Sequence, residues 1–291
     1  MINWQAITAQ LSDCLGEPLL ELQAHPMSGG DINQAFRLFN PERQFFAKFN
    51  RAELLSMFEA EKIGLDEIRR SHSIRVPQVF ATGVDENRAF IVMEYIELGG
   101  PADSERLAIQ LAGMHGFYHQ QFGFHCDNTI GSTAQANPFC DYWIEFWQQH
   151  RLGAQLSLGA RGSFEAALLD AGVRLNENIG KFFQGYKPRP SLLHGDLWSG
   201  NMGSDSTGNP VIYDPACYYG DHESDLAMME LFGNPEPRFF SVYDEIFAID
   251  DGYPLRRDLY NLYHLLNHAN LFGGGYAGQS LALIKRLLAQ V

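Results

Sequence analysis

Residues 193–201 read LHGDLWSGN and residues 211–215 read VIYDP, and these two stretches decide the predicted fold and chemistry. In each, a carboxylate (Asp196 or Asp214) follows a short apolar run that favours a strand, and Asn201 comes five positions after Asp196. Mg²⁺ prefers carboxylate and amide oxygens, and phosphoryl transfer uses a separate carboxylate to orient the attacking hydroxyl. We therefore expect Asn201 and Asp214 to hold Mg²⁺ on a nucleotide and Asp196 to orient a hydroxyl group. An isolated Asp or Asn is better explained as a cap or turn residue, but the ordered set argues against that alternative.

Lys48 stands in the apolar stretch FFAKF, residues 45–49, where a charged amine is costly unless an anion meets it. A predicted helix from about residue 52 to residue 70 follows, and its apolar residues form one stripe: Leu54, Phe58, Leu65 and Ile68. Glu61 falls within that stripe, so its carboxylate should point inward. A Lys–Glu pair of this kind positions the α- and β-phosphates of ATP in kinases. The alternatives are a structural ion pair between two lobes and an exposed lysine on an edge strand.

A glycine-containing loop, SGGDIN at residues 28–33, separates two predicted strands. Glycine lets backbone N–H groups approach a phosphate closely, so we expect Gly29 and Gly30 to contact ATP. The loop lacks the G-x-x-x-x-G-K-[ST] pattern and no predicted helix follows it, which argues against a P-loop and against a Rossmann site. A strand–loop–strand unit over the phosphates is the kinase arrangement, although an ordinary hairpin turn has the same pattern.

The end of the predicted strand at residues 89–95 is the candidate adenine site. Four consecutive residues are expected to contact the nucleotide there: Met93, Glu94, Tyr95 and Ile96. The Glu94 carbonyl and the Ile96 amide are the groups that we expect to hydrogen-bond the adenine edge. An ordinary strand end is the alternative.

The pattern of elements changes at the linker, residues 96–101. Residues 1–95 begin with a helix between Asn3 and Gly16 and continue as short strands with one inserted helix. Residues 102–291 consist mainly of helical patterns. This predicts an α+β, two-lobed fold with a small antiparallel, nucleotide-binding lobe, a hinge, and a larger helical lobe that carries catalytic and substrate groups.

Composition restricts the partners and the location. The 291 residues include 21 basic and 35 acidic residues, a formal charge of −14, so we expect no binding to nucleic acid or to an anionic membrane. Acidity favours cationic ligands such as amines, but it is also common in ordinary soluble proteins. The four cysteines form no C-x-x-C pair, and neither a signal peptide nor a membrane span is expected. These features together predict a cytoplasmic location.

The motifs resemble the protein-kinase-like superfamily, in its aminoglycoside and choline phosphotransferase branch, where the catalytic loop reads H-G-D-x-x-x-x-N as in residues 194–201. More narrowly, the chain resembles the fructosamine kinase (ketosamine-3-kinase) family over nearly its whole length. That narrow match rests on residues 193–201, on DPACYYGDHESDLAM at residues 214–228 and on the glycine loop. Further support comes from scattered positions: residues 122–124, Asn128, residues 130–131, Gln135, Asn137 and the helix at residues 143–151.

The resemblance implies a protein-kinase-like fold and ATP-dependent phosphorylation of the 3-hydroxyl of a ketosamine, such as a ribulosamine, erythrulosamine or fructosamine adduct of an amine. The 3-phosphate then breaks down and frees the amine, so the reaction is a deglycation step. The implied roles cover five residues: Asp196 as base, Asn201 and Asp214 as metal ligands, and Lys48 with Glu61 as the phosphate clamp. Asp225 is expected to brace the catalytic loop, with His194 as a structural residue of that loop.

One position departs from the family pattern. Many members carry Cys in the glycine loop where this chain has Asp31, so a thiol-based redox switch is not expected here. An acidic side chain near phosphates is repelled, so Asp31 should point outward.

The candidate walls of the sugar-amine site are aromatic. The faces of Trp198, Tyr218 and Tyr219 suit sugar C–H groups and a cationic amine, with core packing as the alternative. Two His-x-x-x-His pairs, His115 with His119 and His264 with His268, have no evident third ligand, which argues against zinc.

Two other functions remain open at this point. The acceptor is alternatively an aminoglycoside, choline or another small alcohol. A nucleotide-binding pseudokinase is the alternative of another class, although Lys48, Asp196 and Asp214 are all present. A protein kinase with a long activation loop is disfavoured, because Asp225 follows Asp214 by only eleven positions. The preferred ketosamine and the oligomeric state are not decided by the sequence.

Overall fold

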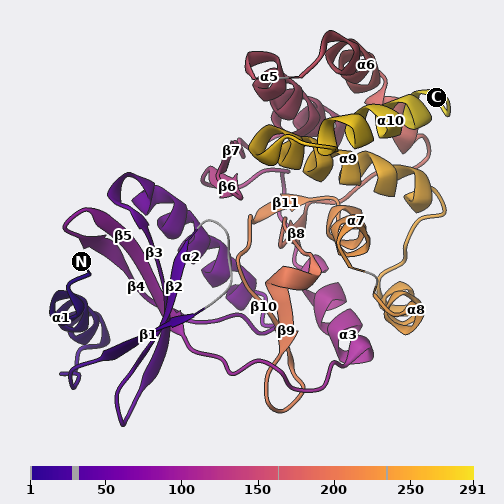
Figure 1. Ribbon diagram of the computed structural model, residues 1–291. Helices are drawn as coiled ribbons and strands as arrows, with labels where there is room; N and C mark the ends of the chain where they lie inside the picture. Colours follow the sequence, from indigo (N-terminus) through magenta and orange to yellow (C-terminus); the bar gives the residue numbers. More distant parts are fainter. Residues whose placement is uncertain (1, 28–32, 163, 234) are drawn as a thin grey trace. The chain divides into compact units, whose positions relative to one another are not determined.

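The computed structural model describes residues 2–27, 33–162, 164–233 and 235–291, which form two compact units. The first unit comprises Met1–Asp103 and Met202–Pro215, and the second comprises Ser104–Asn201 and Ala216–Val291. Helices and antiparallel strands are both present (Figure 1), so the predicted α+β fold class is confirmed.

The first unit is built on a five-stranded antiparallel sheet with the order β1-β2-β3-β5-β4. Its strands are β1 (Gln23–Met27), β2 (Gln34–Phe39), β3 (Gln44–Arg51), β4 (Val79–Asp85) and β5 (Arg88–Glu94). Within this sheet β3 is central, and Lys48 lies opposite Ala35 of β2 and Ile91 of β5. Pairing on both sides fixes the direction in which the Lys48 side chain leaves the strand.

Two helices accompany the sheet. Helix α1 (Trp4–Leu15) begins where the sequence predicts, because the Asn3 Oδ1 atom accepts a hydrogen bond from the Ala6 amide at 3.1 Å. It ends before Gly16, whose φ of 71° suits glycine. A short 3₁₀ turn, η1 (Ala52–Leu54), precedes helix α2 (Leu55–Arg70). The buried residues of α2 include Phe58, Leu65 and Ile68, which confirms most of the predicted apolar stripe.

The hairpin of β9 (Met202–Ser204) and β10 (Pro210–Ile212) groups with the first unit, whereas the sequence placed residues 102–291 together in the second lobe. The cause is hydrogen bonding. Gly99 and Gly100 donate their amides to the Ser204 carbonyl at 3.1 and 3.2 Å. A Cβ at Gly100 would lie 1.8 Å from the Asp205 carbonyl oxygen, so only glycine fits there. No local sequence pattern reveals this long-range pairing.

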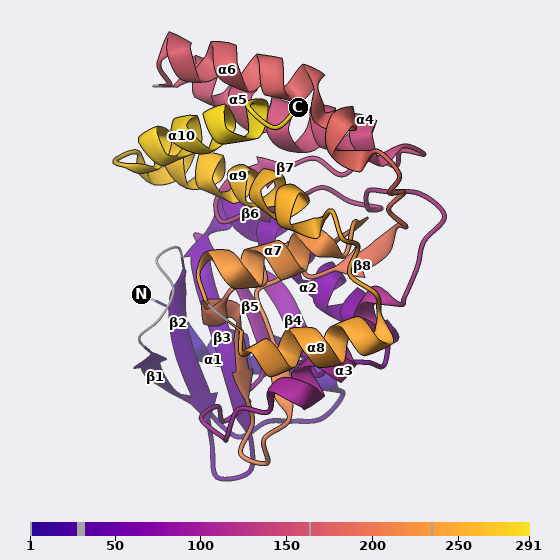
Figure 2. The same ribbon diagram turned by 90° about the vertical axis from the view of Figure 1, so that its right-hand side faces the viewer.

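The second unit is mainly helical. Its helices are α3 (Ser104–His115), α4 (Trp143–Trp147), α5 (Gly153–Arg161), α6 (Ala166–Glu177), α7 (Glu223–Leu231), α8 (Pro237–Ile246), α9 (Tyr253–Phe272) and α10 (Tyr276–Leu288). Short helical segments are the π-helical η2 (Gln148–Leu152) and the 3₁₀ turns η3 (Ile179–Phe183) and η4 (Ser199–Asn201). Helices α9 and α10 lie side by side in both ribbon views (Figure 2) and are in contact.

Two small antiparallel pairs of strands interrupt these helices. Strands β6 (Asn128–Ile130) and β7 (Thr133–Gln135) pair with each other, and β8 (Ser191–Leu193) pairs with β11 (Tyr218–Gly220). In the second pair Leu193 lies opposite Tyr218, and the Ala216 amide donates to the His194 carbonyl at 2.8 Å. Ala216 and Tyr218 are therefore hydrogen-bonded or paired with His194 and Leu193, the first two residues of the LHGDLWSGN motif.

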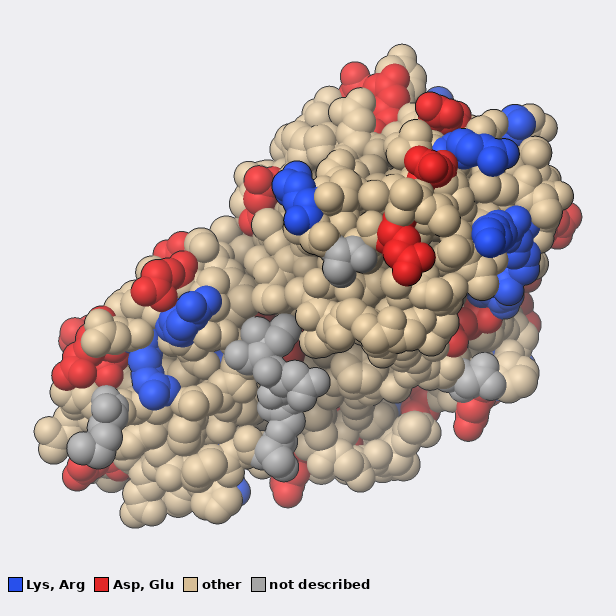
Figure 3. All heavy atoms as spheres, turned by 45° about the horizontal axis from the view of Figure 1, so that its top comes forward, with Lys and Arg blue, Asp and Glu red and all other residues tan. Residues whose placement is uncertain are grey.

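The surface carries both charges. On the face drawn in Figure 3, acidic and basic side chains lie in small separate groups rather than in one large patch of either sign. Among the described residues, every helix is too short or too polar to serve as a membrane span.

Candidate active site

The first candidate cluster lies entirely in the first unit and joins Lys48, Glu61 and Asp214. The Lys48 Nζ atom donates to the Glu61 Oε1 atom at 2.7 Å and also to the Asp214 Oδ1 atom. The Lys48 and Glu61 side chains are only 7% and 10% exposed, whereas that of Asp214 is 43% exposed. The predicted Lys–Glu pair is thus present, and it is joined by the acidic residue that the sequence assigned to the metal.

Each member of this cluster comes from a different element. Lys48 lies within β3, Glu61 is on the inward side of α2, and Asp214 follows β10. Asp214 has a φ of 58°, in the left-handed region that residues other than glycine seldom adopt. Asp and Asn tolerate this region better than most residues, because their short side chains make local hydrogen bonds.

Charge is concentrated at these three side chains. Burial opposes the charge on Lys48, but Asp214 and Glu61 more than offset it, so the pKa of Lys48 is raised and the amine remains charged. Burial raises the pKa of Glu61 to about 7, although the charge of Lys48 acts in the opposite direction. Glu61 therefore changes protonation near neutral pH, while Lys48 does not.

The second candidate cluster lies in the second unit, in the loop after β8. The Asn201 Nδ2 atom donates to the Asp196 carbonyl at 2.9 Å and to the Asp196 Oδ2 atom at 3.1 Å. The Asn201 amide group therefore fixes the orientation of the Asp196 carboxylate. Because its nitrogen is turned toward Asp196, its Oδ1 oxygen is the atom that suits a cation.

Asp225 braces this loop from α7, as expected. Its carboxylate accepts hydrogen bonds from the His194 amide at 2.7 Å and from the Gly195 amide at 2.9 Å. Burial alone would raise the pKa of Asp225, but the hydrogen bond and charge of His115 and the backbone donors lower it. Gly195 has a φ of 82°, and a Cβ there would lie 2.2 Å from the Ala216 carbonyl oxygen. The loop and the backbone of Ala216 therefore fit together only with glycine at position 195.

His115 is a supporting residue that the sequence did not assign. Its ring nitrogens lie 3.2 Å from the Asp225 carboxylate and 2.6 Å from the Tyr243 hydroxyl, and the side chain is fully buried. The sequence shows only a histidine on the buried face of a helix, α3. It does not reveal the partners on α7 and α8, because they lie more than 100 positions away.

Known proteins show which family this chain resembles. The sequence model described as fructosamine kinase matches residues 3–290. A probable ketoamine kinase of Synechocystis is 43% identical over 290 residues, covering 98% of this chain and 97% of the relative. A chloroplastic protein-ribulosamine 3-kinase of Oryza sativa subsp. japonica is 44% identical over 262 residues, covering 89% of this chain and 76% of the relative.

The chain belongs to the fructosamine kinase family. Among solved structures, it is similar to a putative fructosamine-3-kinase of Haemophilus somnus, with a TM-score of 0.89, 26% identity and coverage of 98% and 97% of the two chains. The choline kinase LicA of Streptococcus pneumoniae shares the fold, with a TM-score of 0.65, 16% identity and 99% coverage of both chains. The predicted protein-kinase-like fold is thereby confirmed.

The aromatic side chains of this fructosamine kinase family member differ in exposure. Trp198 is 37% exposed, with its ring 6.4 Å from that of Phe232. Tyr218 and Tyr219 are buried, and the Arg151 guanidinium lies 4.0 Å from the centre of the Tyr218 ring. These contacts favour the core-packing alternative for the two tyrosines and leave Trp198 as the candidate wall.

The predicted nucleotide-binding segments are partly described. Gly29, Gly30 and Asp31 lie outside the described residues. Met93 is buried, and the Glu94 carboxylate accepts a hydrogen bond from Arg75 at 2.7 Å. The adenine contacts of residues 93–96 remain predictions.

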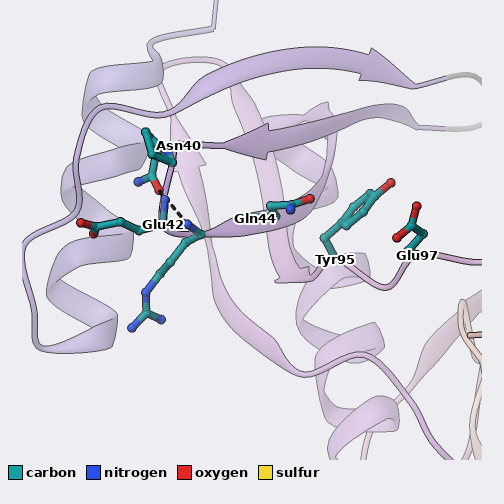
Figure 4. Close-up of a pocket in the computed structure, with 7 residues that line it drawn as sticks. Asn40, Glu42, Gln44, Tyr95 and Glu97 are labelled. Carbon is teal, nitrogen blue, oxygen red and sulfur yellow. Dashed lines mark hydrogen bonds between the residues drawn. The ribbon is translucent and has the colours of Figure 1, made fainter. Parts of the chain in front are cut away.

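A shallow hollow of about 340 Å³ lies in the first unit beside the end of β5. Tyr95 and Glu97 line it together with the turn between β2 and β3, where Asn40 caps the backbone (Figure 4). The Arg37 guanidinium lies 4.9 Å from the Tyr95 ring centre. The Tyr95 ring thus lies beside a residue of β2.

The histidine pairs have separate partners. His115 contacts Asp225, whereas the His119 ring stacks on Phe139 with a centroid distance of 4.8 Å. Burial lowers the pKa of His264 to about 3. Among the described residues, no group of three His, Cys, Asp or Glu side chains is placed to hold a metal ion.

Proposed function

We propose that this chain is an ATP-dependent kinase that phosphorylates the 3-hydroxyl of ketosamines, the ribulosamine, erythrulosamine or fructosamine adducts of amines and lysine. The observation that carries the proposal is the braced Asp196–Asn201 loop, present together with the Lys48–Glu61–Asp214 cluster. A relative named protein-ribulosamine 3-kinase, at 44% identity, supports the choice of acceptor.

The donor set fits Mg²⁺ and a nucleotide. Asn201 Oδ1 and the half-exposed Asp214 carboxylate are hard oxygen ligands of the type that Mg²⁺ prefers. When bound, Mg²⁺ neutralises charge that develops on the phosphate oxygens. The Lys48 amine, which stays charged, holds the α- and β-phosphates, and Glu61 keeps that amine in place.

Asp196 is proposed to act on the acceptor. Its carboxylate orients the ketosamine hydroxyl and accepts the proton late, because a loose transition state needs little basicity early. Asn201 holds the carboxylate in one orientation, and Asp225 holds the backbone beneath it. Most of the catalytic effect of these residues is thus positioning and electrostatics.

The acceptor is tested with a panel of hydroxyl compounds and radiolabelled ATP. Ribulose-lysine, erythrulose-lysine and fructose-lysine are compared with an aminoglycoside and with choline, and Asp196→Asn serves as the inactive control. We expect labelled product with at least one ketosamine, and release of free amine as the 3-phosphate breaks down. Product only with the aminoglycoside or choline would reassign the acceptor.

The same panel addresses the pseudokinase alternative. The absence of an ATP-dependent product with every acceptor, despite nucleotide binding, would favour a binding module. The proposed place of action is the cytoplasm, where the cysteine pattern predicts a reducing environment.

A further inference from the structure

Gln135 is a buried polar residue for which the mechanism above has no role. It ends β7 in the second unit and is 2% exposed, yet both ends of its amide are hydrogen-bonded. The oxygen accepts from the Tyr263 hydroxyl at 2.6 Å, and the nitrogen donates to the Asn128 side-chain oxygen at 2.8 Å and to the Ala216 carbonyl at 3.3 Å. Burial raises the pKa of Tyr263, so its hydroxyl remains protonated and donates.

Asn128 makes the same kind of contact with the next backbone carbonyl, that of Cys217. Its Nδ2 atom donates to the Cys217 carbonyl at 2.8 Å. The β6–β7 hairpin therefore supplies one hydrogen bond to each of two consecutive backbone carbonyls. Because these side chains are also bonded to each other, neither can move without leaving a buried polar group unpaired.

The backbone that they hold starts two residues after Asp214. On its other side, the Ala216 amide donates to the His194 carbonyl at 2.8 Å, and the Ala216 carbonyl leaves no room for a Cβ at Gly195. The backbone of a single residue, Ala216, is thus held by the β6–β7 hairpin through its carbonyl oxygen and by the catalytic loop through its amide nitrogen.

Asp214 needs such an anchor. Its φ of 58° is combined with a following proline, and a residue before proline normally adopts an extended conformation. An unfavourable backbone conformation persists only when the surrounding structure holds it from both sides. Before Asp214, the β9–β10 pairing fixes the backbone, with Ile212 opposite Met202. After it, the β6–β7 hairpin binds the carbonyls of Ala216 and Cys217.

We propose that Gln135, oriented by Tyr263 and assisted by Asn128, is a positioning residue that holds the backbone after Asp214 in its catalytic conformation. The kinetic part of this inference rests on the proposed function, since it takes Asp214 as a metal ligand. The structural part, which concerns the mobility of residues 214–217, does not.

The test compares two buried glutamines in the same unit. Gln155 of α5 is 3% exposed and hydrogen-bonded to Asn267 at 3.2 Å and to Asn270 at 2.8 Å. It also interacts with Tyr263, so it shares that neighbour with Gln135, but none of these partners belongs to residues 214–217. Gln135→Met and Gln155→Met each remove one buried amide and keep the length of the side chain. Both should lower Tm by a similar amount. Only Gln135→Met should lower kcat, by about 10- to 100-fold, and raise the Mg²⁺ concentration for half-maximal activity, with the ketosamine KM nearly unchanged.

Hydrogen exchange gives a readout that needs no acceptor. In Gln135→Met, the peptide that contains the Ala216 amide should exchange faster than in Gln155→Met. Tyr263→Phe removes one oxygen and keeps the ring, so it should shift kcat and the exchange in the same direction but less. Should Gln135→Met fail to fold, this variant decides: exchange and kcat like those of the unmodified protein would overturn the proposal.

The remaining outcomes are distinguishable. Equal kcat and equal exchange in the two methionine variants would reduce Gln135 to a structural residue. If the unmodified protein phosphorylates no ketosamine, the proposed function fails. Faster exchange of the Ala216 amide in Gln135→Met alone would then still support the anchoring role. If the Ala216 amide exchanged no faster in that variant, the anchoring role would be refuted.

Discussion

In the first unit Lys48 is held by two carboxylates, whereas in the second unit the loop of Asp196 is held by backbone hydrogen bonds to the buried Asp225. The first arrangement is ionic, and its Asp214 side chain is half exposed. The second is enclosed, because Asp225 is 1% exposed and its pKa is lowered. An ionic cluster can exchange one partner for an anionic ligand, while a buried brace must remain intact throughout the reaction. The two groups should therefore respond differently to substitution and to pH.

The largest effect is expected from Asp214→Asn. Asn tolerates a φ of 58° and keeps the shape of the side chain, so the change removes mainly the charge. Turnover should fall by about 100-fold or more while Tm changes little. Initial rates over a Mg²⁺ series, with Tm measured alongside, check this. Unaltered Mg²⁺ dependence would contradict the metal assignment.

Asp225→Ala should affect stability as well as rate. It leaves two buried amides and His115 without their acceptor, and we expect the free energy of unfolding to fall by about 3 kcal/mol. Urea denaturation measures the loss. Asp66→Ala, which breaks only exposed ion pairs of α2, is the control and should cost less than about 1 kcal/mol. Equal losses of unfolding free energy in the two variants would show that Asp225 stabilises the protein no more than an exposed ion pair does.

The pH dependence should follow Glu61. Its pKa of about 7 means that the carboxylate is ionised above neutral pH and becomes protonated as the pH falls through 7, which weakens its pairing with Lys48. At saturating acceptor, kcat/KM for ATP should decrease by up to about tenfold between pH 7 and pH 6. Glu61→Gln should have a lower kcat/KM above pH 7 and lose this limb of the profile. A profile that is unchanged in the variant would assign the titration to another group.

The smallest effect is expected at Trp198. Trp198→Ala should raise the KM for the ketosamine by about two- to fivefold, because an exposed aromatic face contributes modestly to binding a cationic amine. Trp198→Phe, which keeps an aromatic face, should recover most of the affinity. Steady-state kinetics with the acceptor varied measures both. Equal KM values in all three proteins would remove Trp198 from the acceptor site.

Local patterns predicted much of this arrangement. The helical stripe placed Glu61 toward Lys48, and Asn3 and Gly16 delimited α1. These predictions depend on residues that are close in the sequence, where the periodicity of a helix or a capping side chain decides the geometry. The grouping of Met202–Pro215 with the first unit and the contacts of His115 escaped prediction, because they are hydrogen bonds between distant segments.

The sequence by itself determined the family, the α+β class and the identity of the polar residues in the two motifs, because these depend on residue type, order and spacing. Only the tertiary structure decided that Asp214 pairs with Lys48, that Tyr218 lies beneath Arg151, and that Gln135 reaches the Ala216 carbonyl. Each of these contacts joins residues at least 67 positions apart. Which distant groups meet is set by the packing of whole elements, and no periodicity of a single segment carries that information.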